Sequence, residues 1–394
     1  MAVYLLAFFL TGACLYKAAY YDRKCRGIPL RNTLLFDGGG VVPTDEYVLW
    51  ESGGASARKK NKALYELWFW LAVLPIFLIT ALRYDVGTDY FFTYVPEFNH
   101  ILNGSAGFSE WGFNQLIRLI QVFTSNPQWL FVVTGFIFSL ATVRTVSRCS
   151  DDPVLSVAVL LVSCFYFWSL NNVRQAIAAV LVFAAFPAML KPNFLNGVRF
   201  AFFLALAFCF HQSVLIMALP FLVLCIKPAR KYFPAVAMLG LILLPIGSQL
   251  AALLLKGTKY YYYFVTDYNN GEATVLLILY HLFFFGYAWL ILEKYRLRDA
   301  RAYVLLFMQY LCFLTATASL FLSMPEMISR LTMYFQVFQI LLIPRCCRAI
   351  PGKWYWRALV AGIYIAAWLA YLLYFIVWKG FHGVLPYQWI FQAH

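Results

Sequence analysis

Long apolar runs recur from one end of this 394-residue chain to the other. Many span roughly 16 to 23 residues, and a helix of that length crosses about 30 Å of hydrocarbon. Lipid tolerates only helices or closed barrels, because every backbone polar group must be bonded internally, and the alternating segments of a barrel are absent from the sequence. The sequence therefore predicts an all-α polytopic membrane protein.

The composition agrees with this class and argues against a nucleic-acid-binding protein. Hydrophobic residues make up 63% of the chain, only 12% of residues are charged, and the mean hydropathy is +0.72. The net charge of +14 is strongly basic, but the Lys and Arg residues lie in short loops between alternate spans. That distribution orients a membrane protein, so we expect no nucleic-acid partner.

The runs and the basic loops together predict about twelve transmembrane helices, with the N- and C-termini both outside. The run 194–226 is too long for one crossing, so we expect two short spans that meet at an outer tip, 211–213. The other spans are expected at 3–20, 64–82, 127–146, 154–170, 171–190, 233–255, 274–292, 302–322, 328–343 and 356–377.

We expect a single transmembrane domain, 1–394, with three polar segments. Residues 21–62 are basic and glycine-rich, which is typical of a flexible cytoplasmic loop. Residues 83–126 form an outer segment, in which 111–123 has the spacing of an amphipathic helix on the membrane surface. A tyrosine-rich outer loop is expected at 256–273. The apolar face of the amphipathic helix is expected to comprise Trp111, Leu116, Leu119 and Ile120.

The stretch RYDVGTDY, which begins at Arg83, breaks an apolar run with charge at the expected outer end of a span. An arginine there can hold a phosphate group, and a carboxylate near it can accept a proton. Gly87 suits a turn that requires a positive φ. Asp89 is the better candidate for a base, whereas Asp85 has the simpler interpretation of an ion pair with Arg83.

Other polar residues are expected at the same outer depth as Arg83. Arg174 begins a span, His211 lies at the hairpin tip, and Arg330 lies about one turn into another span. Helix N-termini favour anions, and the guanidinium fork matches phosphate oxygens, so the set predicts a pyrophosphate site. Each arginine alone has the alternative of snorkelling to the interface.

Two further residue types leave alternatives open. His211 can donate a hydrogen bond to a leaving phosphate or take a proton from a sugar hydroxyl, but a histidine on an apolar helix is more often a packing residue. The row of tyrosines 260–263 can stack on sugars, although an aromatic belt at the interface explains it equally well.

The sequence shows no sign of other familiar chemistry. Nucleotide-binding glycine loops, a convincing Ser-His-Asp order and paired metal-binding aspartates are absent. The nine cysteines lie in apolar runs or in basic loops without zinc-ligand spacing, so we expect no disulfide framework and no metal site. No cofactor is expected.

Four short motifs resemble those of the EpsG family, which is related to Wzy-type polymerases. They occur in order across 64–344, and the set is more specific than any one member. The motifs are RYDVGTDY with the following Tyr94 and Phe98, RQAIA from Arg174, FHQSVL from Phe210, and SR from Ser329 followed by Tyr334-Phe335. Gln212 stands where proline is common in the family, and 21–62 and the outer tail look peculiar to this chain.

The resemblance implies a Wzy-like helical bundle, described also as GT-C-like, in the inner membrane of a bacterium. It implies a metal-independent glycosyltransferase that moves a growing glycan from undecaprenyl pyrophosphate to a sugar hydroxyl of the next lipid-linked repeat unit, in exopolysaccharide, capsule or O-antigen synthesis. A chain-length regulator and a flippase are candidate protein partners, and membrane lipid is expected to surround the protein. Motif positions Asp85, Tyr90, Gln175 and Tyr334 are expected to support the site.

Combining residues and resemblance, we expect Arg174 and Arg330, with Arg83, to clamp the lipid pyrophosphate. Asp89 or His211 would deprotonate the acceptor. Three rival functions stay open: a lipid-linked oligosaccharide ligase, a polysaccharide or lipid transporter (flippase), and a sugar acyltransferase that uses His211. Mid-span charges are nearly absent from the sequence, which disfavours the transporter.

Overall fold

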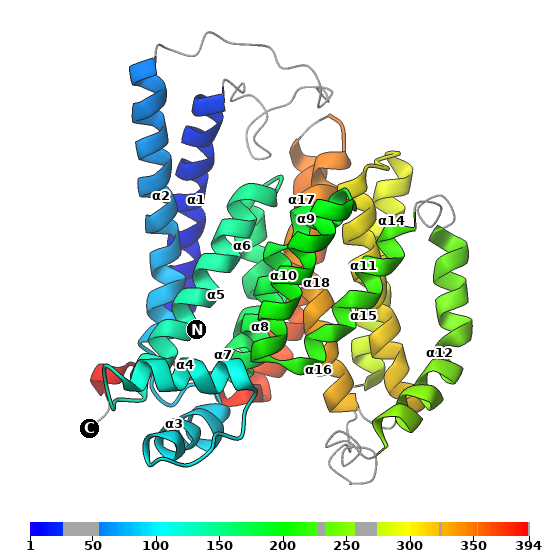
Figure 1. Cartoon of the computed structure of the whole chain (residues 1–394). Helices are drawn as coiled ribbons and strands as arrows, with labels where there is room; N and C mark the ends of the chain where they lie inside the picture. The colour runs from blue at the N-terminus through cyan, green and yellow to red at the C-terminus, as the bar shows by residue number, and fades with distance from the viewer. Residues whose placement is uncertain (27–54, 227–232, 257–273, 323–324, 353, 393–394) are drawn as a thin grey trace.

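The computed structural model describes residues 1–26, 55–226, 233–256, 274–322, 325–352 and 354–392. Over these ranges the chain is helical and has no strand, as the sequence predicts. Figure 1 shows the helices packed side by side in a bundle, with two short helices lying across one end of it. The predicted loops 21–62 and 256–273, with the tyrosine row 260–263, fall largely or wholly outside the described residues.

Among the described residues, six helices are long and apolar enough to cross a membrane, or seven if one bent pair counts as a single span. The chain is therefore a multi-pass membrane protein. The count of about twelve spans and the outer placement of both termini remain predictions. The long helices are α1 Ala2–Arg26, α2 Ala55–Ala81, α5 Gln128–Cys149, α14 Thr274–Lys294, α15 Ala300–Leu322 and α18 Trp354–Leu372, which continues into η6 Leu373–Trp378.

Three expected spans are each built from two shorter helices. The pair α6 and α7 is bent by 56° at Ser163–Cys164, where Cys164 has a φ of +61°. The other two pairs, α8 with α9 and α16 with α17, are likewise interrupted by a short break between their helices. Their bounds are α6 Pro153–Val162, α7 Phe165–Asn171, α8 Val173–Ala184, α9 Phe186–Leu190, α16 Pro325–Gln336 and α17 Gln339–Ala349.

The predicted hairpin within 194–226 is present. Helix α10, Phe194–Phe210, ends just before His211, and the chain reverses into η3, Gln212–Met217, and α11, Ala218–Cys225. Helix α12, Phe233–Leu255, matches its predicted bounds. The hairpin places His211 at a turn between two helices, as the basic residues on both sides of the run predict.

The segment after α2 forms η2, Tyr90–Tyr94, α3, Val95–Leu102, and the amphipathic helix α4, Trp111–Gln121. The predicted apolar face of α4 needs correction, because this helix has two apolar faces. One packs inward and comprises Phe113, Ile117 and Ile120, whereas Trp111 and Leu119 are 70% and 59% exposed. The inward face belongs to a separate cluster with Tyr94, Phe98 and Phe131, so α4 is anchored to the bundle.

We call the end of the bundle that carries Arg83, Arg174 and His211 the motif end. Helices α3 and α4 lie across it, and both chain termini lie toward it in Figure 1. A 2.9 Å hydrogen bond from the Tyr4 hydroxyl to the Val384 carbonyl joins the two terminal regions. Which side of the membrane this end faces remains a prediction.

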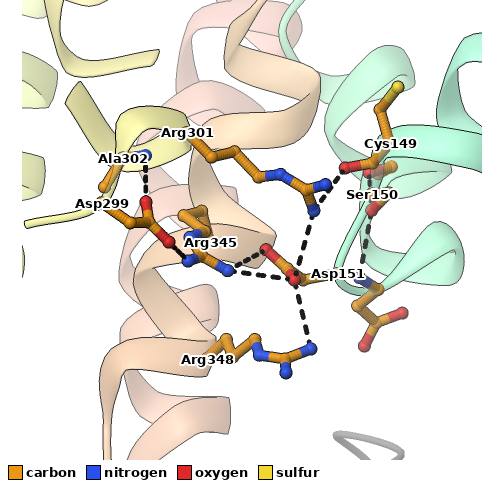
Figure 2. A network of polar contacts seen from close by, with 10 residues as sticks. Cys149, Ser150, Asp151, Asp299, Arg301, Ala302, Arg345 and Arg348 are labelled. Atoms are coloured by element: carbon orange, nitrogen blue, oxygen red, sulfur yellow. Dashed lines mark hydrogen bonds and ion pairs between the residues drawn. The ribbon is translucent and has the colours of Figure 1, made fainter. Parts of the chain in front are cut away.

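We call the opposite cluster of Asp151, Arg301, Arg345 and Arg348 the arginine end. Figure 2 shows the three guanidinium groups directed at Asp151, which lies in the turn between α5 and α6. Arg345 also pairs with Asp299. This network ties α15 and α17 to the start of α6, and both Asp151 and Arg345 are at most 6% exposed in their side chains.

Candidate functional site

Arg83 is buried at the motif end, where its guanidinium group shapes the backbone. Only 1% of the residue is exposed. Its Nη1 donates a 2.8 Å hydrogen bond to the Val86 carbonyl and another to the Leu170 carbonyl in α7. The ring of Phe131 lies 4.8 Å from the guanidinium carbon. Arg83 therefore joins the first motif to α7, a setting that differs from the ligand-binding role expected of it.

Gly87 turns the chain with a φ of +95°, as the sequence predicts. A Cβ atom at this position would lie 2.9 Å from the Leu170 carbonyl oxygen, so any side chain would push the first motif away from α7. The close approach keeps that carbonyl within reach of Arg83.

Asn171 connects the first motif to the second. Its Oδ1 accepts hydrogen bonds from the Thr88 hydroxyl at 2.8 Å and the Asp89 backbone amide at 2.9 Å. The Tyr94 hydroxyl donates to the Asn171 carbonyl and accepts from the Val173 amide, at 2.9 and 2.8 Å. These bonds fix the start of α8, and hence Arg174, against the segment that carries Asp89.

Arg174 and His211 converge on one buried carboxylate, Glu110. The Nη1 atom of Arg174 lies 2.5 Å from Glu110 Oε2, and His211 Nδ1 lies 3.0 Å from Oε1. The Glu110 side chain is 4% exposed, whereas those of Arg174 and His211 are 25% and 23% exposed. The carboxylate is thus enclosed, and each of its two partners keeps an open side.

A close contact between α4 and α10 produces this arrangement. Glu110 precedes the first residue of α4, and His211 follows the last residue of α10. A Cβ atom on Gly112 would lie 2.6 Å from the Cβ of Cys209, so glycine permits the approach. Upstream, Glu97 accepts from the Ser109 amide at 2.7 Å and also from its hydroxyl, which holds the chain that enters α4.

The electrostatics of Glu110 follow from this geometry. Burial on its own would raise the pKa of the carboxyl group, but the contact with His211 and the charge of Arg174 outweigh it and lower the pKa to about 2. Glu110 is therefore ionised at neutral pH. A fixed negative charge between two side chains that face outward orients both of them.

The fourth motif joins the cluster through α8 and η3. Gln175, next to Arg174, donates from Nε2 to the Arg330 carbonyl. The Ser213 and Tyr334 hydroxyl groups lie 2.9 Å apart, which ties α16 to the segment after His211. Arg330 is itself half-buried. Motifs two, three and four therefore meet at the motif end, and Gln175 and Tyr334 hold them together.

The remaining predicted residues occupy different settings. Asp85 is exposed with a φ of +50°, and Arg83 directs its guanidinium at carbonyl oxygens and not at this carboxylate. Asp89 is half-buried. Tyr90 is buried, stacks on Phe131 with 4.2 Å between ring centroids, and donates to Gln128 at 2.7 Å. Tyr90 thus has a packing role within the described structure.

Sequence reasoning missed Glu110. Its signal is modest: it is one of four carboxylates in the segment 83–126, and it stands immediately before the apolar helix 111–121. A carboxylate at that place is ordinarily explained by the helix dipole. Glu110 makes no side-chain capping bond to α4, so its carboxylate is available to the two partners from α8 and α10.

The comparisons with known proteins agree with the gathered motifs. A family profile described as EpsG family matches residues 66–389. The chain belongs to the EpsG family. Searches of curated proteins and of solved structures gave no match. Membership relates this EpsG family chain to exopolysaccharide production at a membrane, and a polymerase of the glycosyltransferase kind fits that family in general.

The match also extends beyond the motifs quoted from the sequence. It includes most of the segment after α18, which looked peculiar to this chain. In this EpsG family chain, that segment lies against the first motif. The backbone amide of Tyr84 donates to the Gln388 carbonyl at 3.0 Å, and the backbone amide of Ile390 donates to the Leu82 carbonyl at 3.0 Å. The C-terminal segment is therefore part of the motif end.

Proposed function

We propose that this protein polymerises lipid-linked oligosaccharide repeat units. In the proposed reaction, a growing glycan leaves undecaprenyl pyrophosphate and joins a sugar hydroxyl of the next lipid-linked unit. The observation that carries the proposal is the convergence of Arg174 and His211 on Glu110, with Arg330 attached to the same helix start through Gln175. Guanidinium groups beside a histidine and a nearby carboxylate suit a pyrophosphate leaving group and a hydroxyl acceptor.

The proposed roles divide the residues into ligands and supports. Arg174 and Arg330 bind the lipid pyrophosphate and stabilise the charge that develops on it as the glycosyl bond breaks. Asp89 or His211 accepts the proton of the acceptor hydroxyl. Arg83 acts as a support, because its guanidinium is buried against Val86 and Leu170. The same lipid-linked substrate serves as donor and acceptor, so no nucleotide is needed.

The proposed topology has about twelve spans, with the motif end outside the inner membrane of a bacterium. The arginine end then faces the cytoplasm, in agreement with the positive-inside rule. Three spans built from paired short helices, together with the hairpin 194–226, support the higher count. Cysteine accessibility at Ser105 and at Lys294, on opposite sides in this topology, tests the orientation. Labelling of both by an impermeant reagent from the same side would contradict it.

A reconstitution experiment tests the reaction. Purified protein in proteoliposomes receives lipid-linked repeat units, and the products are separated by size. A ladder of lengths is the expected result. A single addition to a different lipid or acceptor would favour the ligase, flipping without glycan growth would favour the transporter, and dependence on an acyl donor would favour the acyltransferase. In cells, deletion of the protein should leave single lipid-linked units in the membrane.

A further inference from the structure

The segment after α18 brings a histidine into the motif end. The carbonyl of His382 accepts a 2.9 Å hydrogen bond from the Thr88 amide, and the carbonyl of Gly383 accepts a 3.0 Å hydrogen bond from the Gly87 amide. Both donors belong to the first motif, next to Asp89. The backbone of His382 and Gly383 is therefore fixed to two residues of the first motif.

His382 has a conformation that side chains usually avoid. Its φ is +65°, in the left-handed region, between Gly380 and Gly383, which also have positive φ values. A non-glycine residue held there stores strain, and such strain concentrates at functional sites. Glycine would fit this backbone without strain, so the imidazole group is retained at an energetic cost.

The imidazole group of His382 is partly buried, and one of its ring nitrogens has no hydrogen-bond partner among the described residues. Its ring lies edge-on to Trp168 of α7, with 5.7 Å between centroids, and against Phe381, at 4.1 Å. The Nε2 atom is buried, and no hydrogen-bond partner reaches it among the described residues. A buried polar atom without a partner is costly, so it marks a place for a ligand atom.

The neighbouring charge indicates what kind of group Nε2 meets. Burial, and then the positive charge of Arg330, lower the pKa of His382 to about 3. The imidazole is therefore neutral at pH 7, and in this form one ring nitrogen carries a proton and donates. A neutral donor beside a guanidinium group suits an anion, because it adds a hydrogen bond without a further cation to desolvate.

We propose that His382 is a binding residue for the pyrophosphate group of the lipid-linked substrate, which it contacts through Nε2. This inference rests on the proposed function and adds the C-terminal segment to the substrate site. The four motifs in the sequence do not include this residue. The ligand chemistry is a phosphoanhydride, whether it is carried by a polyisoprenoid or free in solution.

Two substitutions separate the imidazole from the backbone that carries it. His382→Gly keeps the left-handed conformation without strain and removes the donor, so the variant is expected to fold at least as well as the wild type. His382→Asn tolerates the same backbone and keeps a shorter amide donor. The matched control is His100→Asn, at an exposed histidine on α3.

The measurement is binding of undecaprenyl pyrophosphate to protein in nanodiscs, with undecaprenyl monophosphate and inorganic pyrophosphate as comparison ligands. His382→Gly is expected to weaken undecaprenyl pyrophosphate binding roughly 10- to 100-fold, His382→Asn by less, and His100→Asn not at all. Weaker binding of inorganic pyrophosphate as well would assign recognition to the phosphoanhydride alone. An effect confined to the lipid would assign it to the whole headgroup.

Unchanged binding of undecaprenyl pyrophosphate by a folded His382→Gly variant would overturn the inference. If that variant does not fold, 15N-histidine spectra of the wild-type protein provide the test, and the His382 signal must shift when the lipid is added. A wild-type protein that binds the lipid but forms no polymer would refute the proposed reaction and leave this inference intact. A wild-type protein that does not bind the lipid would refute both.

Discussion

Each end of the bundle has basic side chains around a buried carboxylate, but the two ends differ in how far those side chains are enclosed. At the arginine end, Arg345 is 6% exposed in its side chain and shared between Asp151 and Asp299. At the motif end, Arg174 and His211 share Glu110, yet about a quarter of each side chain remains exposed. The first arrangement encloses one arginine between two carboxylates and leaves Arg301 and Arg348, with side chains 33% and 42% exposed, at its edge. In the second, neither of the two side chains that share the carboxylate is enclosed in this way, and both stay partly accessible, which is what a binding site requires.

This contrast shows that the role of an arginine near the end of an apolar run cannot be inferred from the sequence alone. Arg83, Arg174 and Arg345 all lie near the ends of apolar runs. Arg83 donates to backbone carbonyls, Arg345 completes an ion network, and Arg174 keeps an open side. The exposed fraction of an arginine side chain and the type of group it contacts distinguish a structural arginine from one that can bind a ligand. Variants at both ends of the bundle can test this distinction.

The largest effect is expected from Asp89→Asn. Loss of a general base typically lowers turnover about 10²- to 10⁴-fold. Chain extension should fall by that factor while undecaprenyl pyrophosphate binding stays intact. The matched variant Asp299→Asn, at the arginine end, should change the rate per folded molecule by less than about twofold. Normal extension by Asp89→Asn, with extension lost in His211→Asn, would move the base to His211.

Arg174→Lys should have the next largest effect. Lysine keeps the charge but loses the planar fork, so turnover is expected to fall roughly 10²- to 10³-fold with little change in thermal stability. The same substitution at the arginine end, Arg348→Lys, should leave turnover unchanged because that side chain serves the Asp151 network. Equal losses from both variants would show that the ends do not differ as described.

Asp151→Asn should destabilise the fold and spare the chemistry. It leaves Arg345 buried with Asp299 as its remaining partner. Removing one partner from a buried ion pair costs about 3 kcal/mol or more, so the thermal midpoint in detergent should fall by roughly 5 °C. The turnover of the fraction that stays folded should match the wild type. A large fall in turnover per folded molecule would mean that the arginine end acts on the site.

The smallest effect concerns pH. The folded-state pKa of Glu110 is about 2, below its ordinary value of 4.5, so its stabilisation is complete above pH 4.5 and declines as the pH falls toward 2. Between pH 4.5 and 3.5 the loss should be about 1 kcal/mol. Glu110→Gln should lack this component, and the difference between its melting curve and that of the wild type should shrink on acidification. A difference that grows would contradict the ionised state of Glu110.

The sequence predicts much of the fold because lipid leaves few alternatives. Span positions follow from apolar length, and the hairpin 194–226 follows from basic residues on both sides of a long run. The bend within 154–170 was not predicted, because no proline or glycine marks it near Cys164. Local sequence carries little information about such tertiary effects.

The site was predicted less completely than the fold. The four motifs identified Arg174, His211 and Arg330, since unusual polar residues stand out in an apolar chain. Glu110 and His382 were missed, because their partners lie 52 or more residues away and only the folded chain brings them together. Arg83 was assigned by residue type, and residue type does not show whether a guanidinium faces a ligand or a carbonyl oxygen.

The position of the C-terminal segment, which carries His382, has a consequence for biosynthesis. Residues 382–390 are translated some 300 positions after the Arg83 region on which they lie. During synthesis, nearly every helix of the bundle must therefore be made before the motif end can be completed. Under the proposed function, a chain that ends before these residues would lack part of the substrate site and would therefore be inactive.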